Sequence, residues 1–144
     1  MYSTILAAVD GSARSRAVLD AALEICQGSS ARVHLFRAVE VPPEFAAAAH
    51  MPPDTLPAYL EKEARDYLIE LAAGHPRVHV EAPDMTTPKP WRAVLQAATR
   101  LAADLIVIGS HGHGGWDRIL ATNAARVADF SDRNVLIVHD RPAS

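Results

Sequence analysis

Asp104-Leu-Ile-Val-Ile-Gly-Ser-His-Gly112 is the segment from which the fold class follows. Its first half is a short apolar run, and glycine and polar residues come directly after it. An apolar run of this length, bounded by turn residues, is typical of a β-strand that is buried on both faces. Strands of that kind belong to parallel sheets covered by helices. We therefore predict a buried strand over residues 104–108 and a loop that begins at Gly109.

Four other segments have the composition of strands. They are residues 4–9, 32–39, 78–82 and 135–138. Helical periodicity appears after the first of them, where Val18, Ala21, Ala22 and Ile25 recur at the spacing of one helix face. We predict a helix over residues 13–27, with Ser12 as its N-cap and Gly28 as its end.

Further helices are expected in the rest of the chain, over residues 56–73, from 86–91 onward, over 116–121 and over 123–130. Strands and helices thus alternate along the sequence, which predicts an α/β fold with right-handed crossovers. The expected architecture is a single doubly wound sheet of five parallel strands with helices on both faces. Residues 40–57 are rich in proline, and we expect a long surface loop that either covers a site or hangs free.

Composition limits the classes of function. A length of 144 residues predicts a single domain over residues 1–144. The net charge of −3 and an aromatic content of 6% disfavour a nucleic-acid-binding surface. No apolar run approaches the roughly 20 residues that cross a bilayer, so no membrane association is expected.

The single cysteine, Cys26, is either a small buried side chain or a reactive thiol. With one cysteine, no internal disulfide can form, and a cytoplasmic location is expected.

Two loops are the candidates for a functional site. In open parallel sheets, ligands bind beyond the carboxyl ends of the strands where the strand order reverses. Asp10-Gly11-Ser12 follows the first strand, and the second loop, residues 109–115, contains four glycines. Glycines let backbone N–H groups approach a phosphate, although they also serve tight turns alone. Asp10 could accept hydrogen bonds from a ribose, hold a metal or cap the following helix.

Several other chemistries are less well supported by the residues. The second loop lacks the lysine of a Walker A motif and does not match the dinucleotide fingerprint. His111 and His113 could share a metal, but donating to a phosphate or packing on the loop suits them better. Ser12, His111 and Asp10 could converge as a hydrolase, yet the sequence shows no convincing nucleophile and base. We assign neither catalytic residues nor metal ligands.

The sequence resembles the universal stress protein family over nearly its whole length. The resemblance rests on Ile5-Leu-Ala-Ala-Val-Asp-Gly-Ser12, on Asp104-Leu-Ile-Val-Ile-Gly-Ser-His-Gly112 and on Val135-Leu-Ile-Val138. It implies the strand order 3-2-1-4-5. It also implies a homodimer formed by antiparallel pairing of the last strands, here from Asn134 to His139. An edge strand with an apolar, unpaired side is a physically reasonable place for such pairing.

The resemblance also implies ATP binding, with Mg²⁺ and little or no turnover. The family's ATP pattern is Gly, two residues, Gly, nine residues, then Gly-Ser or Gly-Thr. Its first half is intact as Gly109-Ser-His-Gly112, whereas Thr122-Asn123 stands where the second half has Gly-Ser. The segment from Asn123 to the last strand is also about one residue shorter than in ATP-binding relatives. The alternative is a dimeric stress or interaction protein that binds no nucleotide.

The resemblance assigns a role to each candidate binding residue. Ala8, Val9 and Asp10 meet the nucleoside, with Asp10 on the ribose, and Val39 meets adenine through its backbone. The remaining residues serve the phosphates: Gly109, His111, Gly112, Thr122, Asn123 and Ala124.

Overall fold

The computed structural model describes residues 1–39, 56–85, 89–110 and 123–139. Its elements along the chain are β1 (Thr4–Val9), α1 (Ser15–Cys26), β2 (Arg32–Arg37), α3 (Leu56–Ala72), β3 (Val78–Val80), α4 (Pro90–Arg100), β4 (Leu105–Gly109), α6 (Asn123–Phe130) and β5 (Asn134–Val138). Residues 40–55 of the loop predicted over residues 40–57 lie outside the described residues, as does the helical piece predicted over 116–121, while the last two residues of that predicted loop begin α3.

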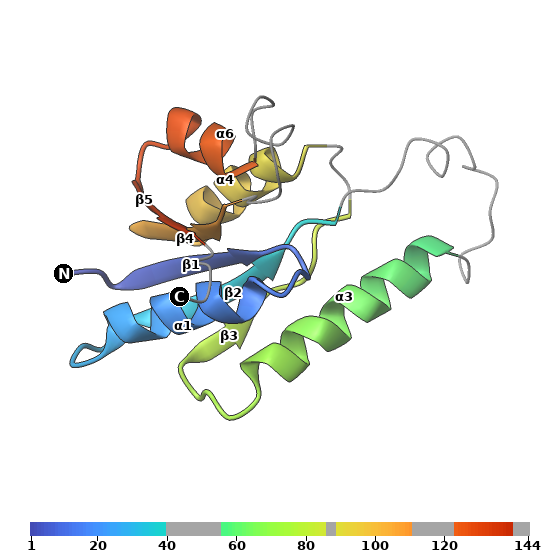
Figure 1. Cartoon of the computed structure of the whole chain (residues 1–144), viewed down its shortest axis with the longest axis horizontal. Helices are drawn as coiled ribbons and strands as arrows, with labels where there is room; N and C mark the ends of the chain where they lie inside the picture. The colour runs from blue at the N-terminus through green and yellow to red at the C-terminus, as the bar shows by residue number, and fades with distance from the viewer. Residues whose placement is uncertain (40–55, 86–88, 111–122, 140–144) are drawn as a thin grey trace, which may run out of the picture.

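The five strands form one sheet in the order β3-β2-β1-β4-β5, and every neighbouring pair is parallel. The predicted α/β class, the strand number and the order 3-2-1-4-5 are therefore confirmed. Helices α1 and α3 cover one face of the sheet and α4 and α6 the other (Figure 1). Because β1 lies between β2 and β4, the chain leaves its carboxyl end beside the end of β4, where the strand order reverses.

The core consists of two layers, one on each face of the sheet. Successive side chains of a strand point to opposite faces, so Ile5, Ala7 and Val9 pack with α1 and α3, whereas Leu6 and Ala8 pack with α4 and α6. Residues of β1 and β4 are almost fully buried on both sides, as the unbroken apolar runs predicted. Among the described residues, no helix is long and apolar enough to cross a membrane.

Asp104 joins the beginnings of the two central strands. Its carboxylate accepts the backbone N–H of Ser3 at 2.8 Å and that of Thr4 at 3.1 Å. In return, the Asp104 N–H donates to the Thr4 carbonyl oxygen at 2.9 Å. These bonds fix the register of β1 against β4 and hence the relative position of the loops at the other ends of the strands.

The first helix begins later than its sequence predicted. We expected it to start at residue 13 with Ser12 as the N-cap, but α1 starts at Ser15 and the N-cap position is Arg14, without a side-chain cap. Gly11, at φ +83°, turns the chain, and Ser12 to Arg14 form a turn that precedes the helix. The Ser12 carbonyl accepts the Ser15 N–H at 3.1 Å, so Ser12 belongs to that turn. The predicted helix end at Gly28 is confirmed, with φ +75°.

Candidate functional site

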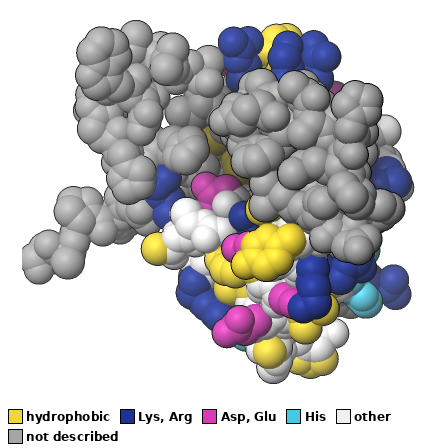
Figure 2. All heavy atoms as spheres, turned by 90° about the vertical axis from the view of Figure 1, so that its right-hand side faces the viewer, with side chains coloured by type: hydrophobic (Ala, Val, Ile, Leu, Met, Phe, Trp, Pro, Cys, Tyr) yellow, Lys and Arg dark blue, Asp and Glu magenta, His cyan; other side chains and the backbone are white. Residues whose placement is uncertain are grey.

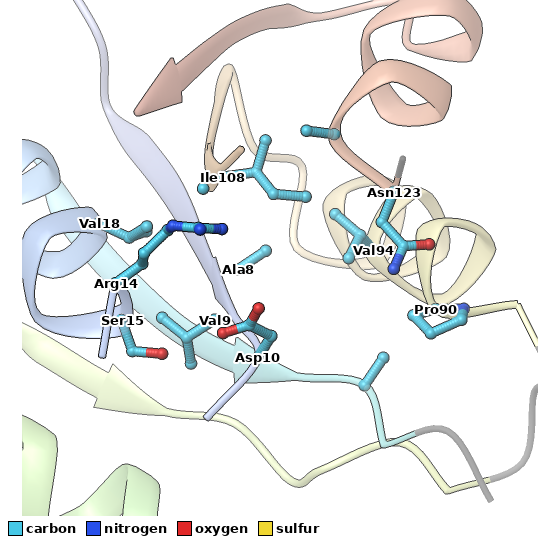
Figure 3. Close-up of a pocket in the computed structure, with 13 residues that line it drawn as sticks. Ala8, Val9, Asp10, Arg14, Ser15, Val18, Pro90, Val94, Ile108 and Asn123 are labelled. Carbon is cyan, nitrogen blue, oxygen red and sulfur yellow. The ribbon is translucent and has the colours of Figure 1, made fainter. Parts of the chain in front are cut away.

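A pocket opens where the carboxyl ends of β1 and β4 lie side by side (Figure 3). The space inside it, its open mouth and adjoining solvent included, is about 530 Å³. Strand ends form its floor and helix termini its walls. The lining residues are Ala8, Val9, Asp10, Arg14, Ser15, Val18, Ala38, Pro90, Val94, Ile108, Gly109, Asn123 and Ala124.

The lining is mostly apolar, with a few polar groups from different elements. Ala8, Val94 and Ile108 supply apolar surface, whereas Asp10, Arg14 and Asn123 supply a carboxylate, a guanidinium and an amide. Figure 3 shows Asp10 and Arg14 on one side of the space and Asn123 on the other. In a view toward this end of the sheet, acidic and basic side chains lie close together near the middle of the surface (Figure 2). An apolar pocket with few oriented polar groups can hold a small organic ligand and fix its direction.

Asp10 is held at the end of β1 by a local turn. Its Oδ1 accepts the Ser12 N–H at 2.9 Å, which closes an Asx-turn. The turn is further fixed by the Gly11 N–H, which donates to Ser15 Oγ at 3.2 Å, and by the Tyr67 hydroxyl, which donates to the Ser12 carbonyl at 3.3 Å. Asp10 does not cap α1, whose N-cap is Arg14. Its carboxylate is exposed at the mouth of the pocket, in a position to meet a ligand.

Arg14 is a pocket residue that our sequence interpretation missed. It is only 6% exposed, and its guanidinium donates from Nη1 to the Ser110 carbonyl oxygen just beyond β4. The sequence does contain a signal for this position, because Arg14 lies four residues before Val18 and therefore on the buried face of the helix. We overlooked it because a charged residue is expected at the surface.

Six of the ten candidate residues line this one pocket: Ala8, Val9, Asp10, Gly109, Asn123 and Ala124. Val39 is not among the lining residues, whereas its neighbour Ala38 is. The Val39 N–H donates to the Asp84 carbonyl at 2.8 Å, because β2 ends at Arg37 and the chain there runs beside the segment after β3. His111, Gly112 and Thr122 lie outside the described residues.

Gly109 has a packing role that the sequence motif does not reveal. A Cβ atom on this residue would lie 3.2 Å from Val18 Cγ2 and 3.8 Å from Arg14 Cβ. Glycine at the end of β4 therefore lets α1 approach the sheet closely and leaves room for the Arg14 side chain. The contact explains the glycine without any ligand.

Metal and thiol chemistry have little support in the described part of the chain. Within it, no group of three histidine, cysteine, aspartate or glutamate side chains is placed to hold a metal ion. Cys26, the last residue of α1, is 1% exposed and packs in the core, which confirms the interpretation as a small buried side chain. Burial raises the pKa of its thiol, and the nearby positive charge of Arg77 lowers it in part. A raised pKa makes the reactive thiolate scarce at neutral pH.

The model of the universal stress protein family matches residues 1–139. The chain belongs to the universal stress protein family. One relative in this family, universal stress protein A homolog 1 of Coxiella burnetii, is 33% identical over 142 residues, which are 95% of this chain and 96% of that protein.

Solved structures of the family share the fold. A universal stress protein in complex with cAMP is 28% identical, with a TM-score of 0.65 over 96% of this chain and 97% of that one. A family protein from Burkholderia pseudomallei is 26% identical, with a TM-score of 0.65 over 95% and 96% of the two chains. The protein MJ0577 is 20% identical, with a TM-score of 0.81 over 99% of both chains, and this likeness concerns the fold alone.

Proposed function

We propose that this universal stress protein binds an adenine nucleotide in the pocket between β1 and β4, as a cytoplasmic stress-response dimer with little or no turnover. The observation that carries the proposal is the Asp10 carboxylate, held by its Asx-turn at the mouth of a mostly apolar pocket. A carboxylate accepts hydrogen bonds from the hydroxyls of a ribose, and apolar walls suit a base. The relative that was solved with cAMP supports a nucleotide as the ligand class.

For the candidate residues we propose the roles that the family resemblance implies. Ala8 and Val9 would contact the nucleoside and Asp10 its sugar, while Gly109, Asn123 and Ala124 would contact the phosphates, as would His111, Gly112 and Thr122. Adenine rests near the end of β2. Since the Val39 N–H is engaged by Asp84, a backbone contact of Val39 with adenine would use its carbonyl oxygen.

ATP with Mg²⁺ is the proposed form of the ligand. Mg²⁺ keeps several waters and binds to substrate phosphates, so it would enter with the triphosphate, while Asp10, the carboxylate among the described lining residues, keeps its proposed role on the ribose. If Asp10 binds the ribose, the described part of the pocket keeps no carboxylate that could orient an attacking water. Slow turnover is the consequence, because phosphoryl transfer depends on such positioning.

The proposed homodimer forms through the last strand, from Asn134 to His139. In the described sheet, β5 pairs with β4 and lies at the edge. Leu136 is 39% exposed there. Pairing two such edges antiparallel would satisfy the backbone groups of both strands and cover the apolar side chain.

The second candidate is a dimeric interaction protein that binds no nucleotide. Thr122-Asn123 in place of Gly-Ser is the observation that favours it, because threonine carries a branched Cβ where nucleotide-binding relatives have glycine. If that branch is what prevents binding, Thr122→Gly would strengthen ATP affinity. An unchanged affinity would remove this explanation.

Two aspartate substitutions test the nucleotide-binding candidate, one in the loop after β1 and one on α1. Asp10→Asn should weaken ATP binding at least tenfold, as expected for the loss of a charge-assisted hydrogen bond of about 1.5–3 kcal/mol. Asp20→Asn, an exposed position on α1, is the matched control and should leave binding unchanged. Equal affinities of the wild type and the Asp10 variant, measured by calorimetric titration, would contradict the proposed role of Asp10.

A further inference from the structure

The wall of the pocket that α4 and α6 form carries one polar side chain among its described residues. Pro90, Val94 and Ala124 supply apolar surface there, and Asn123 supplies an amide. Figure 3 shows this amide pointing into the space on the side of Pro90 and Val94, across from Asp10. Within the described part of the chain, no hydrogen bond uses the Asn123 amide. Its donor and its acceptor are therefore available to a ligand.

An amide suits a different part of a nucleotide than a charged side chain does. It presents a carbonyl acceptor and an N–H donor side by side. A phosphate accepts hydrogen bonds, so it would match the Nδ2 donor of Asn123 and offer no donor to Oδ1. Adenine has the N6–H donor beside the N7 acceptor, and asparagine pairs with both atoms at once. The chemistry of this side chain therefore favours the base over the phosphates.

The place of Asn123 agrees with this pairing. With the sugar on Asp10 and the adenine near the end of β2, the base would lie along the apolar wall of Pro90 and Val94. In the usual anti conformation of a purine nucleotide, the base edge with N7 lies on the same side as the 5′-phosphate. Asn123 begins α6, and its backbone N–H is one of those at a helix start that have no partner within the helix. The backbone of Asn123 can thus keep the proposed phosphate contact while its side chain meets the N7 edge.

We propose that the side-chain amide of Asn123 selects adenine by pairing with N6 and N7 of the base. The inference rests on the proposed nucleotide function and adds to it the group that distinguishes the base. Guanine carries the acceptor O6 beside N7, so Oδ1 of Asn123 would face a second acceptor there. Asn123 stands where the family's ATP pattern has serine or threonine. This departure from the pattern supplies base selectivity in this chain.

The test compares ATP with 7-deaza-ATP, in which a C–H group replaces N7 and the phosphates are unchanged. Both ligands are titrated calorimetrically into the full chain with Mg²⁺. The wild type should bind ATP about 3- to 10-fold more tightly than 7-deaza-ATP, the range for one hydrogen bond between neutral groups. Asn123→Ala should bind the two ligands equally. Gln96→Ala is the matched control, because it removes an amide from an exposed position of α4 and should keep the ratio of the wild type.

Each contrary result has a distinct meaning. Equal binding of ATP and 7-deaza-ATP by the wild type would overturn the contact with N7 and leave the nucleotide function standing. The same holds if Asn123→Ala weakens both ligands equally, because the side chain would then act on the phosphates or on the shape of the pocket. Asn123→Ser takes the place of Asn123→Ala if that variant fails to fold, and it should also lose the ratio. If a folded wild type binds neither ligand, the proposed function itself fails and this inference fails with it.

Discussion

The guanidinium carbon of Arg37 lies 2.7 Å from the position that a Cβ atom would take on Gly11. Arg37 ends β2, and its guanidinium also lies over the ring of Tyr67, 5.5 Å from the ring centroid. Tyr67 in turn donates to the Ser12 carbonyl. The end of β2 and a tyrosine of α3 thus pack around the turn that places Asp10 at the pocket, and glycine at position 11 leaves the space for the Arg37 side chain.

Gly11→Ala should therefore disturb both stability and nucleotide binding. Its φ of +83° alone costs an L-residue about 1–2 kcal/mol, and the new Cβ forces Arg37 away from Tyr67. Gly28→Ala is the matched control, because its φ is +75° but nothing lies within 4 Å of the added Cβ. Chemical unfolding should show a loss in both variants, whereas nucleotide affinity should fall only in Gly11→Ala. Equal nucleotide affinities of the two variants would show that the Gly11 turn does not position the binding site.

The packing role of Gly109 predicts a specific rescue. Gly109→Ala should destabilise the protein by about 1 kcal/mol, because the added Cβ lies 3.2 Å from Val18 Cγ2 and that methyl group must give way by a few tenths of an ångström. In a Val18→Ala background the penalty should disappear, since the conflicting methyl group is gone. A double-mutant cycle on the free energy of unfolding measures this coupling. Additive losses would show that Gly109 is required for another reason.

Much of the fold could be predicted because strands that are buried on both faces consist of short, continuous apolar runs. β1 and β4 are buried on both faces, and their runs and the turn residues after them located both strands and both loops of the site. The start of α1 was predicted wrongly, because Ser12 resembles an N-cap and only the conformation of Gly11 shows that a turn comes first. Strand order is a tertiary property, and the family resemblance rather than periodicity supplied it.

The candidate site was predictable where it depends on strand ends. The pairing of β1 with β4 brings Asp10 and Gly109 to one pocket, as the topology requires. Arg14 escaped prediction because a charged residue is expected at the surface, although its spacing from Val18 places it on the buried face and Gly109 leaves room for its side chain. Val39 was placed at the site by counting along a strand that ends two residues earlier, at Arg37, and there the chain turns its N–H toward Asp84.

Cys26 should make stability fall at alkaline pH. Burial raises the pKa of its thiol, so the folded state holds the proton more tightly than the unfolded state. Below about pH 8.5, the usual thiol pKa, both states are protonated and the stabilisation is complete. Above it the unfolded state ionises, and the stability of the wild type relative to Cys26→Ala should shrink until the folded pKa is reached. Urea unfolding at pH 7.5 and 9.5 measures this difference, and a constant difference would contradict a buried thiol.

A charge on the edge strand should prevent the proposed dimer. Leu136→Lys places a positive charge on β5, and two such strands would repel each other and bury an unpaired charge on pairing. Light scattering after size exclusion should give a dimer for the wild type and a monomer for this variant. Ile69→Lys is the control, because Ile69 is 54% exposed on α3, away from the edge, and should leave the dimer intact. If the Leu136→Lys variant remains a dimer, the interface does not lie on β5.

Direct titration of the wild type is the most direct test of whether the pocket between β1 and β4 holds an adenine nucleotide. The purified chain is titrated calorimetrically with ATP and Mg²⁺, with GTP as the comparison for base selectivity. We expect saturable binding at one site per chain, with a dissociation constant in the micromolar range, about −8 kcal/mol, and weaker binding of GTP. A folded protein that shows no heat of binding at millimolar ATP would contradict nucleotide binding and favour the interaction protein without a nucleotide.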